Sequence, residues 1–191
     1  MQLSKVTSWG LILGGLLGIL GFLVIGIVLG LTDDDIAAAD ELKAFQDNKE
    51  LVGVMLILFV GIFTYMAKSL LQVGQAVKVP DEWYMYLRML IIVILAMLFA
   101  SMSMWMLIPE ESTVESYKMI GLVGESVSSI QLIASSFAFL ILTVFALKNS
   151  AGDQIFRALI TILGVLGVVD IIGLLGVIDT DGDIGMITWI L

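Results

Sequence analysis

The chain contains neither cysteine nor histidine. Without cysteine it can form no disulfide and no thiolate metal site. Without histidine it lacks the commonest ligand for zinc, copper and non-haem iron, and it also lacks the usual proton-shuttling base. Axial haem ligation by histidine is excluded for the same reason. The sequence also has no phosphate-binding loop, so we predict no catalytic residues, no cofactor and no enzyme activity.

Charged residues are scarce: they make up 14 % of the chain, whereas hydrophobic residues make up 60 %. Ordinary globular chains carry roughly 25 % charged residues. A helix rises about 1.5 Å per residue, so roughly 20 apolar residues cross a hydrocarbon core of about 30 Å. Five runs are long enough, at about 9–31, 51–71, 86–108, 126–147 and 157–178. The sequence therefore predicts an all-α, polytopic integral membrane protein: one membrane domain, 1–191, built as a bundle of five transmembrane helices in the lipid bilayer.

The connections between the runs carry an excess of acidic residues and an excess of basic residues in turn. Six of the nine positive residues fall at the N-terminus and in the second and fourth connections, and fourteen of the eighteen acidic residues fall on the other side. Because cytoplasmic loops collect lysine and arginine, we expect a multi-pass protein of the cell membrane with a cytoplasmic N-terminus and an outer C-terminus. An acidic outer face repels anionic partners, and we expect no nucleic-acid partner.

Two connections and the tail contain smaller predicted elements. In the first long loop, residues 36–49 predict a short outer helix with four apolar residues on one side: Ile36, Ala39, Leu42 and Phe45. Residues 112–115 resemble a capping box, which predicts a second short outer helix that ends near Gly121. The apolar tail 184–191 is too short to span a membrane, so it rests in the outer interface or docks on a partner.

Glycines gather in the first and fifth runs. Glycine lets helix backbones approach closely, and in lipid such packing drives association. These glycines either pack the helices within one bundle or form an interface to another subunit. The predicted helix-packing positions are Gly14, Gly18, Gly164, Gly167, Gly173 and Gly176.

Asp170 is the one charged residue in the interior of a run, because Lys68, Arg88 and Arg157 lie at the ends of theirs. A carboxylate near the bilayer centre costs about 2.5–3.5 kcal/mol, so it should face the protein interior and find a partner or a proton. Counting from the outer ends of the runs places Ser135 and Ser136 at its depth. Ser128, Gln131 and Ser135 form a polar stripe on the same helix, and we expect it to point toward Asp170. We interpret this group either as a structural tie between helices or as a proton or cation relay.

Asp179, Asp181 and Asp183 alternate like the start of a calcium loop. Calcium takes six to eight oxygens, and an EF-hand continues with glycine at position six and glutamate at position twelve. Ile184 and Ile190 occupy those positions, so the match ends after the third ligand. We expect a solvated acidic segment, with a weak outer cation site as the alternative.

These features together favour a small, non-catalytic membrane subunit of a larger complex that packs through its glycine-rich helices. The predicted partners are other membrane protein subunits. The alternative is a small proton- or cation-conducting channel or carrier that works through Asp170.

Overall fold

The computed structural model describes residues 5–31 and 36–174, which form six α-helices and no strand. The helices are α1 (Lys5–Leu29), α2 (Ala38–Asp47), α3 (Lys49–Ala76), α4 (Asp81–Met106), α5 (Val114–Lys148) and α6 (Gln154–Leu174). All of them except α2 are long and apolar enough to cross a membrane. The prediction of an all-α membrane protein with five spans is therefore confirmed.

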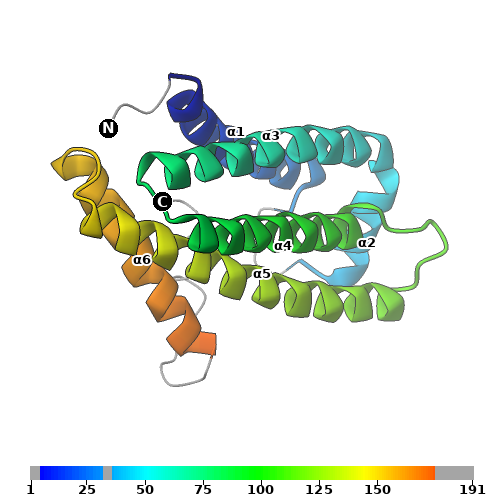
Figure 1. Cartoon of the computed structure of the whole chain (residues 1–191). Helices are drawn as coiled ribbons and strands as arrows, with labels where there is room; N and C mark the ends of the chain where they lie inside the picture. The colour runs from blue at the N-terminus through cyan, green and yellow to red at the C-terminus, as the bar shows by residue number, and fades with distance from the viewer. Residues whose placement is uncertain (1–4, 32–35, 175–191) are drawn as a thin grey trace.

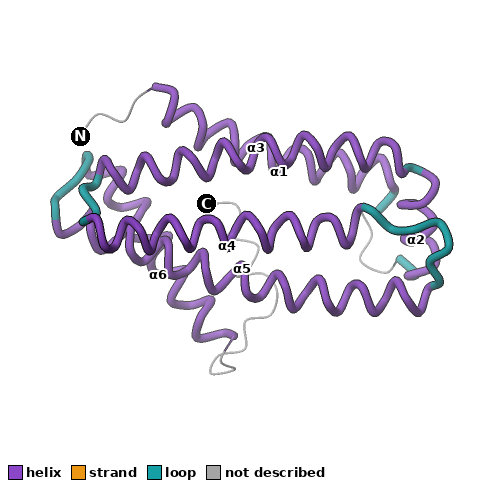
Figure 2. Tube along the Cα trace, turned by 45° about the vertical axis from the view of Figure 1, so that its right-hand side comes forward, coloured by secondary structure: helices purple, strands orange, loops and turns teal. Residues whose placement is uncertain are grey.

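The five long helices follow one another in an open row, although Phe22 and Ile25 of α1 also reach a cavity that α4 and α5 line. Each of them packs chiefly on the next long helix along the chain, so that α3, α4 and α5 lie between α1 and α6 (Figure 1). At the α6 end of the row, α6 crosses α5 obliquely and its C-terminal end points away from the other helices (Figure 2). The outermost helices, α1 and α6, thus each have one long helix as their main neighbour.

The first and third connections meet at one end of the row, which we call the α2 end. The Gln46 side-chain amide of α2 donates to the backbone carbonyls of Pro109 and Glu110, at 3.1 Å each. Lys49 at the start of α3 forms an ion pair with Glu110. Leu42 and Phe45 of α2 are buried, as two of the four residues of the predicted apolar side, whereas Ala39 is exposed and Ile36 precedes the helix. The short helix in the first loop is therefore present and covers this end of the bundle.

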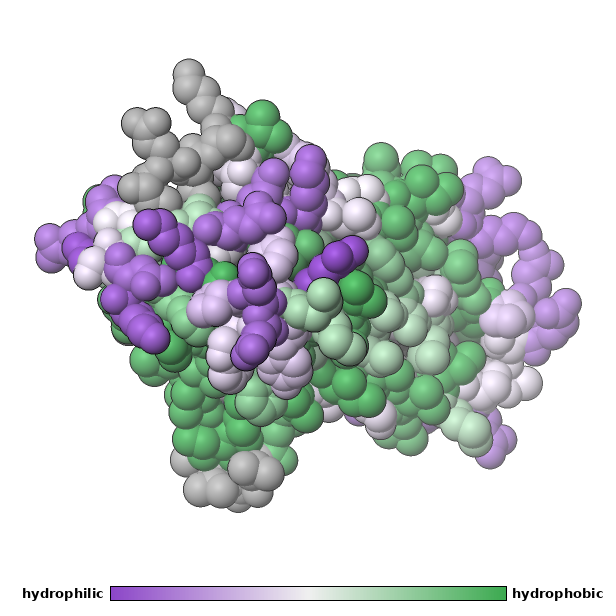
Figure 3. All heavy atoms as spheres, in the orientation of Figure 1, coloured by the Kyte–Doolittle hydropathy of each residue, from purple (hydrophilic) through white to green (hydrophobic). Residues whose placement is uncertain are grey.

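The second and fourth connections meet at the opposite end. The Asn149 side-chain amide donates to the backbone carbonyl of Val77 over 2.7 Å, which ties the end of α5 to the turn after α3. Figure 3 shows hydrophilic residues at both ends of the molecule and hydrophobic residues between them. The loops therefore alternate between two ends, as five membrane crossings require.

Helix α5 differs from the sequence prediction, because it runs unbroken from Val114 to Lys148. A capping box does begin this helix, but one residue later than predicted, with Thr113 as N-cap and Ser116 at N3. The prediction of a separate helix that ends near Gly121 is wrong. Each glycine inside a helix lowers helix stability by about 1 kcal/mol relative to alanine, and burial of the Tyr117 side chain can offset this loss. At 35 residues α5 is about 52 Å long, so it extends well beyond a hydrocarbon core of about 30 Å.

Candidate functional site: buried polar residues on two sides of α5

Asp170 belongs to a single buried stripe along α6. The buried residues of this helix are Ile160, Gly164, Gly167 and Asp170, at spacings of four, three and three. Such spacing places them on one helix face. The two glycines identify that face: a Cβ built on Gly164 would lie 2.6 Å from Thr143 Oγ1, and one on Gly167 would lie 3.1 Å from Ser136 Cα. Asp170, which is 6 % exposed, therefore continues the stripe along the interface with α5.

The close approach of α5 and α6 also permits a hydrogen bond between them. The Thr143 hydroxyl donates to the backbone carbonyl of Ile160 over 2.6 Å, next to Gly164. A larger residue at position 164 would occupy the space of the Thr143 side chain. Glycine spacing and a hydroxyl thus act together to join the two helices.

The structure brings Ser136 to the same interface as Asp170. Ser136 is buried and its backbone touches Gly167, one helical turn from Asp170. The hydroxyls of Ser135 and Ser136 both donate to the backbone carbonyl of Leu132, at 2.8 and 2.9 Å. Their protons are therefore engaged within α5, and their oxygens keep the capacity to accept a hydrogen bond.

Gln131 shares a side of α5 with Ser128, as the predicted stripe requires, but this side faces the cavity and not the α6 interface of Ser136. It is 5 % exposed and lines a cavity with Ser101 of α4 and Ser128 of α5, whose hydroxyl oxygens are 3.0 Å apart. Five residues along a helix turn it by about 140°, so Gln131 cannot share the face of Ser136. In the part of the chain that the structure describes, the Gln131 amide forms no hydrogen bond.

The cavity around Gln131 has a volume of about 290 Å³ and lies between four helices. It is lined by Phe22 and Ile25 of α1, Phe45 of α2, Leu98, Ser101, Met102 and Met106 of α4, and Ser128 and Gln131 of α5. None of these residues is ionisable. Gln131 follows Glu125 by six residues, or about 9 Å of helix, so the cavity lies in the half of the membrane span nearer the α2 end.

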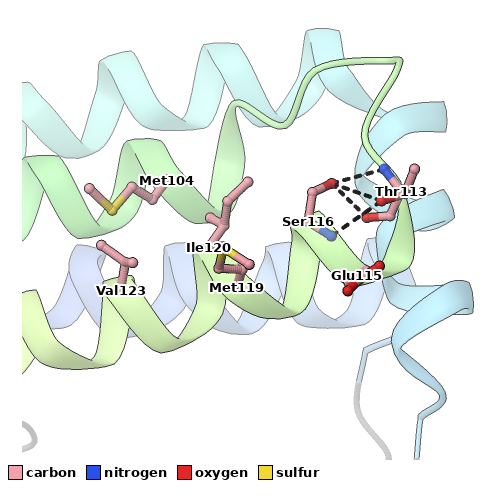
Figure 4. A pocket seen from close by; sticks show the side chains of 7 residues that line it. All are labelled: Met104, Thr113, Glu115, Ser116, Met119, Ile120 and Val123. Carbon is pink, nitrogen blue, oxygen red and sulfur yellow. Dashed lines mark hydrogen bonds between the residues drawn. The ribbon is translucent and has the colours of Figure 1, made fainter.

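A second, larger hollow of about 500 Å³ lies near the first turn of α5, beside Met104 of α4 (Figure 4). Its apolar wall includes Met119, Ile120 and Val123. Its polar rim is already satisfied, because the Ser116 backbone N–H donates to the Thr113 hydroxyl and the Thr113 backbone N–H donates to the Ser116 hydroxyl. This hollow is therefore an apolar surface groove, and beyond the capping pair its polar lining is the exposed Glu115 side chain.

The predicted packing glycines of the first span face α3. A Cβ on Gly14 would lie 3.0 Å from Met66 Cβ, and one on Gly18 would lie 3.2 Å from Phe63 Cζ. Gly173 is half-buried in the last turn of α6, and Gly176 lies outside the described residues. These contacts place the α1 glycines at an internal interface, and the substitutions proposed below test how much they matter.

Sequence reasoning missed a polar contact between α1 and α3 at the end opposite α2. The Thr7 hydroxyl donates to Gln72 Oε1 over 2.7 Å, and the Tyr65 hydroxyl donates to the Val6 carbonyl over 3.1 Å. Both donors and acceptors are visible in the sequence near the ends of two spans. Only the pairing of α1 with α3 shows that they meet.

Asp179, Asp181 and Asp183, the candidate outer cation site, lie outside the described residues. Within residues 5–31 and 36–174, no three acidic side chains come close enough to hold a metal ion. No family model, no curated protein and no solved structure matches this chain. The geometry around Asp170 and around Gln131 is therefore the basis for the function proposed below.

Proposed function

We propose that the chain is a small, non-catalytic integral membrane subunit that contributes to the assembly of a larger membrane complex. The observation that supports this proposal best is the open row of helices, in which α1 and α6 each pack chiefly on one long helix. An open row leaves apolar helix faces available to other membrane subunits. The absence of histidine and cysteine from the sequence agrees with a role in assembly rather than catalysis.

Three glycines give this proposal a specific surface. A Cβ built on Gly15 of α1, or on Gly53 or Gly61 of α3, would meet nothing within 4 Å. Small residues on membrane helices allow a neighbouring helix to approach closely, and helix association in lipid depends on such packing. We assign these three positions to contacts with partner helices, in contrast to Gly14 and Gly18, which lie against α3.

A pair of matched substitutions tests the assignment. Gly61→Leu should leave the fold of the isolated chain intact but remove the protein from its larger assembly on a native gel of mildly extracted membranes. Gly18→Leu should instead destabilise the chain itself, because the new side chain would displace the Phe63 ring. The subunit proposal fails if the unsubstituted chain already migrates as a monomer in the same extract.

A small proton- or cation-conducting channel or carrier is the second candidate, and the burial of Asp170 between α5 and α6 favours it. Membrane-embedded acids often mark ion pathways. Against this candidate, Gln131 and Asp170 lie on different sides of α5, so the buried polar groups around this helix do not form one continuous path. The loop charge bias supports insertion in the cell membrane with the N-terminus in the cytoplasm.

A further inference from the structure

The Gln131 amide is a buried polar group that its surroundings leave unsatisfied. It can donate two hydrogen bonds and accept two. Gln131 is 5 % exposed as a residue and forms no hydrogen bond among the described residues, and what remains accessible of its amide opens onto the cavity that it lines. Burying an amide in this way is unfavourable unless another group bonds to it. The cavity that it lines is the place where such a group can bind.

The neighbouring hydroxyls leave one more acceptor in the cavity. The Ser128 hydroxyl donates to the backbone carbonyl of Gly124 over 2.9 Å. The Ser101 hydroxyl then donates to Ser128 Oγ over 3.0 Å, and Ser101 Oγ keeps free lone pairs. The unused polar capacity is therefore an amide that donates and accepts, and a hydroxyl oxygen that accepts.

The remaining lining excludes a charged ligand. Phenylalanine, leucine, isoleucine and methionine side chains form the other walls, and none of the described residues that line the cavity is a lysine, arginine, aspartate or glutamate. An ion would lose its hydration there with no opposite charge to replace it. The flexible side chains of Met102 and Met106 can adapt to an irregular apolar shape.

We propose that this cavity binds one uncharged lipid with a single acyl chain and a head group that carries both a carbonyl and a hydroxyl. The carbonyl accepts from the Gln131 amide, the hydroxyl donates to Ser101 Oγ, and the acyl chain lies against the apolar walls. The walls come from four helices of this one chain, and Phe45 of α2 closes one side. The volume of about 290 Å³ is at the lower limit of ligand pockets and too small for a partner helix, so the cavity takes the head group and the first part of the acyl chain. The binding site is independent of whether the chain belongs to a complex.

The probe that tests the site is a monoacylglycerol with a photoreactive diazirine in its acyl chain, used with the full-length protein in phosphatidylcholine nanodiscs. Peptide mapping should find saturable labelling in residues 98–106 and 128–131. Excess unlabelled monoacylglycerol should compete with it. Gln131→Leu, which keeps the volume of the side chain and is compatible with folding, should reduce this labelling at least tenfold. Ser129→Ala is the matched control, because Ser129 is half-buried on the same helix but does not line the cavity, so the labelling pattern should not change.

Two results would overturn the proposal. The first is labelling that does not saturate, that spreads over exposed apolar positions such as Ile57 and Leu122, or that is unchanged in the Gln131→Leu variant. Any of these would mean that the probe contacts the protein from bulk lipid only. The second comes from a photoreactive amino acid in place of Leu98 in native membranes. If that residue crosslinks to another protein, a partner and not a lipid fills the cavity.

Discussion

The Cα atom of Ser136 on α5 lies so close to Gly167 on α6 that a Cβ on the glycine would be 3.1 Å away. Backbone meets backbone at this point, so neither helix can yield by rotating a side chain. The contact sets the distance between α5 and α6 and places Asp170, one turn further along α6, at their interface. The glycine stripe and the buried carboxylate are therefore two parts of one helix contact.

Gly167→Ala should destabilise the purified chain by about 1–3 kcal/mol, because an extra methyl group in a tight contact forces the backbones apart. Reversible unfolding in detergent, followed by circular dichroism, measures this change. Gly61→Ala is the control: its Cβ enters open space, so the helix should gain roughly 0.5–1 kcal/mol from the better helix former. Equal stability of the two variants would contradict the packing account.

Asp170→Asn and Asp170→Leu separate a structural carboxyl from a conducting one. If Asp170 ties the helices together, asparagine keeps much of the hydrogen bonding and the variant should assemble nearly normally. Leucine should lose bonds worth about 1 kcal/mol. In liposomes, proton and cation flux should be no greater for the unsubstituted chain than for either variant. Flux that both substitutions abolish would instead establish the channel or carrier.

The loop contacts and the charge bias together predict the orientation of the chain. Lys43 on α2 and Lys148 at the end of α5 are both exposed and lie at opposite ends of the row. Lys43→Cys should react with an impermeant thiol reagent in intact cells, whereas Lys148→Cys should react only after the membrane is opened. The cysteine-free parent provides a blank. Equal labelling of both positions in intact cells would overturn the orientation.

Acid should loosen the α2 end. The Lys49 ammonium bonds to the Glu110 carboxylate and lowers the pKa of Glu110 from its ordinary value. A lowered folded pKa means that the ion pair stabilises the loop above the unfolded pKa of roughly 4.3, and that this contribution disappears as pH falls through the folded value. Both side chains are exposed, so the effect is local and weakened by salt.

Hydrogen exchange of the loop between α4 and α5 measures this change, with Glu110→Gln as control. The parent should lose protection between neutral pH and the acid range, after correction for intrinsic exchange rates. The glutamine variant should show the lower protection already at neutral pH and change little on acidification. A parent and variant with the same pH response would show that the ion pair does not hold the loop.

Much of the fold is predictable from the sequence because hydrocarbon imposes a simple length rule. Long uncharged runs predict the five spans, and the positions of the charges predict that the loops alternate between two ends. The extent of α5 is less predictable, since Gly121 and Gly124 resemble breaks until the burial of Tyr117 is known. Local patterns describe each helix well but do not describe what each helix touches.

In the candidate site, too, the sequence predicts single residues but not which residues meet. The cost of a charge in lipid predicts an inward Asp170, and its burial agrees with that expectation. Gln131 and Ser136 are five residues apart, however, and only the placement of α4 and α6 around α5 reveals that they face different neighbours. The cavity also needs Phe22 of α1 and Phe45 of α2, which no spacing within α5 can indicate.

The central claim is that this chain is one subunit of a larger membrane complex, and its native mass tests that claim most directly. Membranes that hold the tagged chain at its natural level should be extracted with a mild detergent and measured by native mass spectrometry. We predict a species heavier than the 20.7 kDa chain that releases this chain and at least one other membrane protein in fixed ratio on activation. A stable species of 20.7 kDa with no protein partner would contradict the claim.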